Sequence, residues 1–269
     1  MAEAAVRWEV TKGDQMNSRR FTFVYGVCAA LALVAAAPLA QEHAGPHWSY
    51  AGKDGPDHWS ELDKSFSACQ AGHHQSPIDI RAPKAADLPP IQFAYQPVPL
   101  HIVNNGHTIQ VNYAPGSFIT VGDKRYELKQ FHFHHPSEER INGKGFAMVA
   151  HLVHAAPDGA LAVVAVLLDA GAANPFVASL WQHLPSHEGP EQDFDDAKLD
   201  VTALLPTNRG YYTFDGSLTT PPCSENVTWF VLKTPEPISQ GQADAFGKIY
   251  PNDARPTQPL YDRQVLMTR

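Results

Sequence analysis

Short apolar or alternating runs recur along the chain from residue 101 onward, and each has the length of a β-strand. They are rich in Val, Ile, Phe and Tyr, and Gly, Asn or Pro bounds each one. The pattern predicts strands over residues 101–103, 108–113, 118–121, 130–134, 148–154, 161–168 and 228–232.

Helical periodicity is weak along the chain. Asn174 and Pro175 supply a cap and a first-turn proline for a helix over 176–184, and a second helix is predicted over 239–249. No internal repeat or low-complexity linker divides the chain, and its 23 prolines are spread through the connections. We therefore expect one mainly β domain with a few short helices.

The N-terminus has the plan of a secretory signal peptide. Arg19 and Arg20 precede an uncharged stretch, residues 21–37, in which Ala, Val and Leu dominate. The stretch is short for a membrane span, and Pro38 among small residues follows it in place of a stop-transfer pattern. We expect residues 1–40 to be an N-terminal extension and signal peptide, and the mature protein to be periplasmic or extracellular, without a stable membrane anchor.

Charge and cysteine content narrow the picture further. The chain has 20 basic and 28 acidic side chains, and it remains acidic, at about −9, without residues 1–40, which hold four of the basic and three of the acidic ones. This balance argues against nucleic acid as a partner. Cys28 lies in the predicted signal, so Cys69 and Cys223 remain, and an exported pair favours one disulfide over two buried free thiols. The oligomeric state stays open, a dimer included.

Two histidines alternate along the predicted strand over 130–134. His132 and His134 therefore point to one face of the sheet. His151 lies on the next strand, and Asn142-Gly143 between the two strands is a hairpin signal. With these two residues as the loop, His134 pairs with His151 and His132 lies diagonal to it.

A bulge near Pro136 would shift that register, yet the three histidines stay within a pair or two of one another. Three neutral imidazoles without a cysteine form a zinc site with an open fourth position, which is the arrangement of catalytic zinc. An H-x-H pair alone is weak evidence for a metal site, and the third histidine on the facing strand strengthens it.

Six blocks of sequence, in this order, resemble the α-class carbonic anhydrases across nearly the whole of residues 41–269. They are Gly55-Pro56-Asp57-His58-Trp59, Gln75-Ser76-Pro77-Ile78-Asp79-Ile80, Asn104-Asn105-Gly106-His107, Gln130-Phe131-His132-Phe133-His134, His151-Leu152-Val153-His154 and Gly216-Ser217-Leu218-Thr219-Thr220-Pro221-Pro222. The resemblance implies a central, twisted, mostly antiparallel sheet with zinc at the base of a conical cleft. It also implies reversible hydration of CO2 to bicarbonate and a proton.

The resemblance also implies a role for single residues. His132, His134 and His151 hold Zn²⁺, Thr219 accepts a hydrogen bond from the zinc-bound hydroxide that attacks CO2, and Glu138 accepts the hydroxyl proton of Thr219. His107 matches the proton shuttle, with Tyr50 nearby, Gln130 supports His132, and Cys69 and Cys223 match the disulfide of exported members. The positions that match the substrate pocket are Val153, Val163, Leu218, Thr219, Thr220 and Trp229.

This chain departs from the family pattern at Val149, where many members have a carboxylate two residues before the third ligand. His151 must then find its acceptor in a backbone carbonyl, a water or another side chain, and we expect faster zinc loss than with a carboxylate present. Glu139 directly after Glu138, and the short link from His134 to Ser137, are further departures and affect the rim of the cleft.

Two other functions stay open at this point. Zinc hydroxide acting on activated esters would use the same groups, as a side activity. A binding module would resemble family relatives that lost their zinc ligands, and the presence of all three histidines with Thr219 and Glu138 favours the enzyme.

Overall fold

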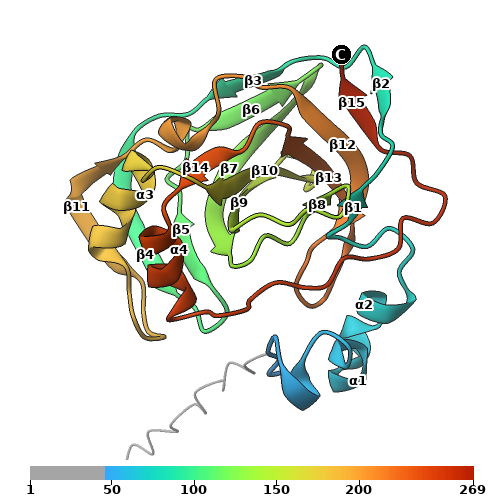
Figure 1. Cartoon of the computed structure of the whole chain (residues 1–269), viewed down its shortest axis with the longest axis horizontal. Helices are drawn as coiled ribbons and strands as arrows, with labels where there is room; N and C mark the ends of the chain where they lie inside the picture. Colours follow the sequence, from blue (N-terminus) through green and yellow to red (C-terminus); the bar gives the residue numbers. More distant parts are fainter. Residues whose placement is uncertain (1–45) are drawn as a thin grey trace, which may run out of the picture. The chain divides into compact units, whose positions relative to one another are not determined.

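A computed structural model of the chain describes residues 46–269 (Figure 1). The signal peptide expected over residues 1–40 lies outside the described residues and stays a prediction, which N-terminal sequencing of the exported protein would test. Within residues 46–269, every helix falls short of the length and apolar character that crossing a bilayer demands.

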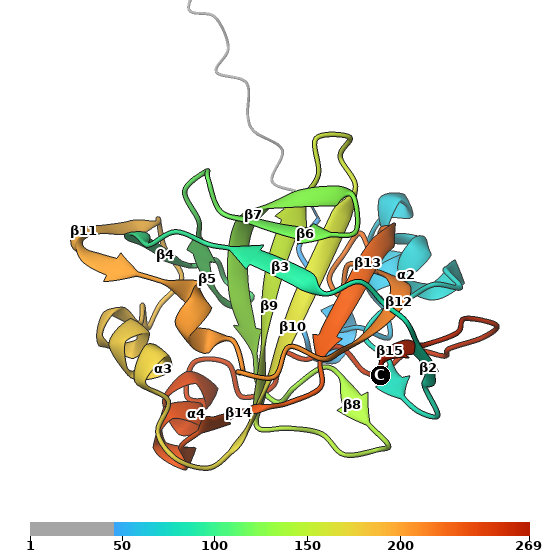
Figure 2. The same cartoon turned by 90° about the horizontal axis from the view of Figure 1, so that it is seen from above.

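One sheet of 13 strands organises the described residues, and a separate pair, β1 with β8, lies apart from it. The central strands follow the order β4-β5-β7-β9-β10-β13-β12, and Figure 2 shows β7, β9, β10 and β13 side by side. Neighbours are antiparallel except β10 with β13, β10 with β14 and β15 with β2. The expected mainly β fold on a mostly antiparallel sheet is confirmed.

The strands are Asp79–Ile80 (β1), Lys84–Ala86 (β2), Ile91–Ala94 (β3), Val98–Asn104 (β4), Ile109–Asn112 (β5), Phe118–Val121 (β6), Lys124–His134 (β7), Arg140–Ile141 (β8), Met148–Ala155 (β9), Leu161–Ala170 (β10), Gln192–Leu199 (β11), Tyr211–Ser217 (β12), Glu225–Leu232 (β13), Glu236–Ile238 (β14) and Leu266–Thr268 (β15). The α-helices are Trp59–Leu62 (α1), Ala68–Ala71 (α2), Pro175–Leu180 (α3) and Gln240–Gly247 (α4). Short 3-10 turns lie at Gly52–Asp54, Lys64–Phe66, Trp181–His183 and Val201–Leu204.

All seven expected strands are present, and both expected helices form. The Asn174 side chain caps α3 by accepting a hydrogen bond from the Val177 N–H, and a 3-10 turn continues α3 to His183. At α4, Ser239 and Gln242 cap one another reciprocally. The edge strand β11 was not expected, because its sequence is mostly polar and exposed.

The alternation along β7 divides its side chains between two faces of the sheet. Phe131 and Phe133 enter the main core, where α3 and α4 cover them through Phe176 and Phe246. His132 points to the opposite face, and Val163 and Trp229 belong to the second apolar cluster. The face of the sheet that carries the histidines is therefore the one opposite α3 and α4.

The register between β7 and β9 differs by two residues from the expected one. His132 pairs directly with His151, and His134 pairs with Val149. The Asn142-Gly143 turn does form, with positive φ at both residues, but it closes a small loop around a bridge between Ile141 and Lys144. The connection leaves the sheet after His134 and places β8 on β1, so the turn does not set the register of the long strands.

A disulfide joins Cys69 in α2 to Cys223 in the loop after β12. The expected pairing is present, and both cysteines are buried beside Trp59 and Phe66. The Cys223 N–H donates to the Thr220 carbonyl at 2.8 Å. The disulfide therefore anchors the loop that carries Thr219 and Thr220.

Replacing both cysteines with serine should lower the free energy of unfolding by about 2–5 kcal/mol, because the bond closes a long loop in the unfolded chain. Guanidinium denaturation of wild type, the double variant and reduced wild type measures this. Reduced wild type should match the variant, and equal stability of all three would contradict the assignment.

Candidate metal centre

Strands β7 and β9 bring His132, His134 and His151 together. Their ring centroids lie 4.8–5.5 Å apart, and one nitrogen of each ring lies within 4.8 Å of the other two. His134 and His151 are buried, whereas His132 is partly exposed. The cluster thus opens to solvent on the side of His132.

The second nitrogen of each ring has a protein partner that orients it. The contacts are His132 Nδ1 with Gln130 Oε1 at 2.8 Å, His134 Nδ1 with the Asp253 carbonyl at 2.7 Å, and His151 Nε2 with Glu139 Oε1 at 2.9 Å. Carbonyl and carboxylate oxygens accept hydrogen bonds, so each ring donates its N–H there. The lone pairs therefore sit on the nitrogens that face one another.

These inward-facing nitrogens fit a metal ion. The buried His134 Nε2 has no hydrogen-bond partner among the described residues, which is costly unless an ion or another group satisfies it. Burial, with the neighbouring imidazoles, holds the pKa of His132 and of His151 well below the ordinary value. The two rings are thus neutral, the form that binds metal.

Glu138 lies against the same cluster. Its Oε2 is 3.5 Å from His134 Nε2 and 3.8 Å from His151 Nδ1, and its Oε1 accepts the Arg255 N–H at 2.8 Å. Burial, and next the Glu139 carboxyl, raise the pKa of Glu138, while the Arg255 N–H and the Thr219 side chain oppose the rise. A divalent cation between the rings would stabilise both charged carboxylates.

The expected substrate positions form an apolar row beside the histidines. Val153 of β9 pairs with Val163 of β10, which pairs with Trp229 of β13. The Trp229 ring lies 4.9 Å from the His151 ring, and Leu218 packs on the same cluster. On the other side, Val153 pairs with Gln130, and Gln130 pairs with Asn112. The face is therefore apolar toward β10 and polar toward β5.

The two threonines expected at the site lie in the loop after β12. Thr219 is buried and Thr220 is partly exposed.

The register places His107 near the same face. Gln110 of β5 pairs with His132, and His107 precedes Gln110 by three residues, roughly 10 Å along an extended chain. The His107 ring stacks on Trp48 at 3.7 Å, and Tyr50 lies between Trp48 and His134, 5.3 and 6.5 Å from their rings. Burial, then His47, lower the pKa of His107, and Glu188 acts in the opposite direction.

Sequence reasoning missed four contributors to this site. Trp48 supports His107, Asp253 acts through its backbone carbonyl, and Arg255 holds Glu138 through its N–H. Glu139 was noted only as a departure at the rim, and the structure places it against His151. A contact made through the backbone cannot be recognised from the residue type. The unusual glutamate at 139 and the missing carboxylate at 149, considered together, could have indicated the contact with His151.

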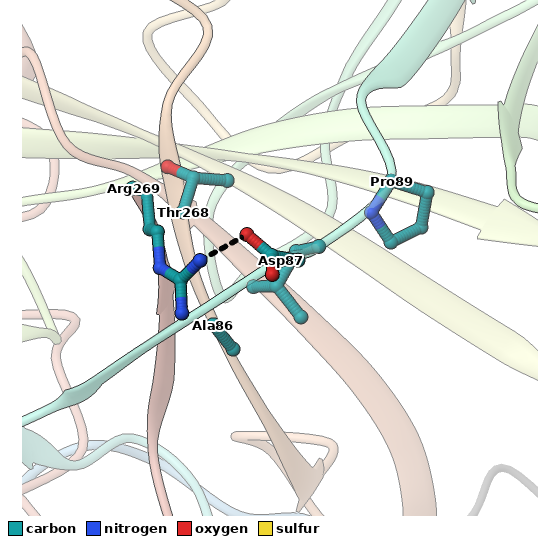
Figure 3. A pocket seen from close by; sticks show the side chains of 6 residues that line it. Ala86, Asp87, Pro89, Thr268 and Arg269 are labelled. Atoms are coloured by element: carbon teal, nitrogen blue, oxygen red, sulfur yellow. Dashed lines mark hydrogen bonds and ion pairs between the residues drawn. The ribbon is translucent and has the colours of Figure 1, made fainter.

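A separate surface pocket of about 500 Å³ lies at the C-terminal ends of the paired strands β2 and β15, and Figure 3 shows its lining side chains. Its polar lining includes an ion pair between Asp87 and Arg269 at 2.6 Å. The pocket is lined by Ala86, Asp87, Leu88, Pro89, Thr268 and Arg269. These residues offer no group of metal-binding side chains comparable to the three histidines.

Comparison with known families gives the site its context. Residues 54–269 match the family model described as eukaryotic-type carbonic anhydrase. The chain belongs to this family. It is an enzyme of the carbonic anhydrase type, and hydration of CO2 is the activity that membership supports.

Named relatives agree with this assignment. Carbonic anhydrases from Nostoc and from Neisseria gonorrhoeae are each 44% identical to the chain, over 82% of its length and 85% and 87% of theirs. The α-carbonic anhydrase of Thermovibrio ammonificans, solved with sulfanilamide, is 42% identical with a TM-score of 0.80, covering 82% of this chain and 99% of that one. The resemblance proposed from the sequence blocks is thus confirmed.

Proposed function

We propose that this carbonic anhydrase is a zinc enzyme and that His132, His134 and His151 hold the metal. The observation that supports this most is the convergence of three ring nitrogens whose opposite nitrogens are each bonded to a protein oxygen. Three neutral imidazoles with an open fourth position suit catalytic zinc. Zinc held there would supply a hydroxide nucleophile near neutral pH, a role for which carbonic anhydrases are the standard example.

Thr219 and Glu138 orient the nucleophile in this proposal. Glu138 Oε1 is engaged by the Arg255 N–H, and its buried Oε2 is left available to accept the Thr219 hydroxyl proton. With its proton committed to Glu138, the Thr219 oxygen can only accept a hydrogen bond from the nucleophile. Thr219 would thereby orient a nucleophile toward the apolar side of the site.

The apolar row formed by Val153, Val163 and Trp229, with Leu218 beside it, is the proposed seat for CO2. A small apolar molecule gains from apolar walls and needs little polar recognition. The charged product bicarbonate is better solvated toward Gln130 and the partly exposed His132, which favours its departure on that side.

His107 is the proposed proton shuttle. It lies near the open side, and burial lowers the pKa of its imidazole, which favours the neutral form and the release of a bound proton to buffer. Stacking on Trp48 holds the ring in one position while leaving it partly exposed to buffer. The same nucleophile acting on activated esters would be a side activity.

Stopped-flow CO2 hydration with zinc analysis tests the whole proposal. Wild type should hydrate CO2 with about one zinc per chain, and His132→Ala should lose both zinc and activity because one of three ligands is gone. His187→Ala, which removes an exposed histidine, is the control and should retain both. Zinc bound fully without hydration would favour a binding module, and a colorimetric ester assay on the same samples tests the side activity.

His107→Ala should lower kcat in weak buffer by about 10²-fold, the scale of one positioned acid–base group, and leave kcat/KM unchanged. Added imidazole should restore kcat because it carries the proton instead. His187→Ala, at an exposed histidine, is the control. An unchanged kcat in His107→Ala would exclude the shuttle and leave the zinc proposal intact.

A further inference from the structure

Glu139 is a buried carboxylate placed against a histidine of the metal cluster. Its Oε1 lies 2.9 Å from His151 Nε2, and the side chains of both residues are 2% exposed or less. The residue lies in the link between β7 and β9, twelve residues before His151, directly ahead of β8. A carboxylate here would not remain buried without a strong partner, and the imidazole N–H supplies one.

The link holds Glu139 in place through its neighbours. The Ser137 hydroxyl donates to the Glu139 carbonyl at 2.9 Å and accepts the Phe146 N–H at 2.9 Å, which ties both ends of the link together. On the other side, Arg140 begins the short parallel pairing of β8 with β1. The carboxylate is thus positioned by a rigid connection outside the main sheet.

Val149 occupies the position on β9 that shares a face with His151, two residues before it. It is fully buried in the second apolar cluster, together with Ile78, Ile80 and Phe146. An aliphatic side chain there cannot accept the His151 proton. The carboxylate that contacts His151 is therefore at residue 139, and residue 149 supplies an apolar side chain to the core.

We propose that Glu139 is the positioning residue that fixes the tautomer of His151, in place of the carboxylate that many family members carry at the position of Val149. By accepting a hydrogen bond from the Nε2–H, it leaves the lone pair on Nδ1, where it could bind the metal. The proposal rests on the zinc site proposed above. Faster zinc loss was expected because residue 149 is a valine and His151 was thought to lack a carboxylate partner. With Glu139 as that partner, the reason for this expectation no longer applies.

The two consecutive glutamates then have separate tasks. Glu138 turns toward Thr219 and the Arg255 N–H, and Glu139 turns toward His151. Loss of Glu138 should act on turnover, since its effect passes through Thr219. Loss of Glu139 should act first on metal retention, since its effect passes through a ligand.

The test moves the carboxylate back to the strand. Glu139→Ala should release zinc to excess chelator about 10–100-fold faster than wild type, the usual cost of removing such a partner. The double variant Glu139→Ala/Val149→Glu should recover zinc retention to within a few fold of wild type. Glu139→Ala/Val149→Gln has a side chain of the same size without the charge, and it should recover less.

Nitrogen-15 NMR of the zinc-loaded proteins detects the His151 Nε2–H proton directly, so it reports on the hydrogen bond and not on packing. Wild type should show a His151 Nε2–H proton shifted strongly downfield, Glu139→Ala should lose this signal, and the Val149→Glu double variant should regain it. Thermal unfolding of the metal-free proteins separates loss of the fold from loss of the site. If Glu139→Ala does not fold, Glu139→Met replaces it, because methionine keeps most of the volume and has no strong acceptor.

Zinc retention in Glu139→Ala equal to wild type would overturn this inference alone. A folded double variant that fails to recover retention would overturn the exchange between the two positions. Failure of wild type itself to bind zinc would instead overturn the proposed function, on which the inference rests.

Discussion

The pairing of His132 with His151 across β7 and β9 is the constraint on which the rest of the site depends. Because side chains alternate along a strand, this register sends the three imidazoles to one face and Phe131 and Phe133 to the other. A slip of one residue would bury the imidazoles beneath α3 and α4 and expose the phenyl rings. The apolar core and the cluster of three imidazoles therefore require the same register, and the stability of the sheet protects the geometry of the site.

The hydrogen-bond partners of the three imidazoles lie at very different sequence separations from their histidines. Gln130 lies on the same strand as its histidine, Glu139 lies in the link that follows, and Asp253 lies beyond α4 near the C-terminus. The first partner is set as soon as β7 forms. The last requires the C-terminal segment to pack, with the Arg255 guanidinium bonded to the backbone carbonyls of Ser76 and Cys69. Completion of the site thus depends on nearly the whole described fold.

The sequence was informative wherever the signal was local. Alternation predicted the central strands and the common face of His132 and His134, and Asn174 marked the start of α3. The register of β7 and β9 was predicted two residues away from the observed one, because the Asn142-Gly143 turn serves β8, which docks on the distant β1. The polar edge strand β11 gave no periodic signal, and Asp253 acts through a carbonyl that every residue has.

Residues at two different sequence positions can reach the same nitrogen of His151. A carboxylate that supports His151 must reach Nε2, and either the neighbouring strand position or the link after β7 can supply it. At the strand position, Val149 adds to the second apolar cluster and avoids placing a charge among its buried apolar side chains. In the link, Glu139 contacts the same imidazole from outside the sheet, next to Glu138, which accepts the Arg255 N–H. His151 Nε2 thus has an acceptor, although the strand position two residues before His151 is aliphatic in this chain.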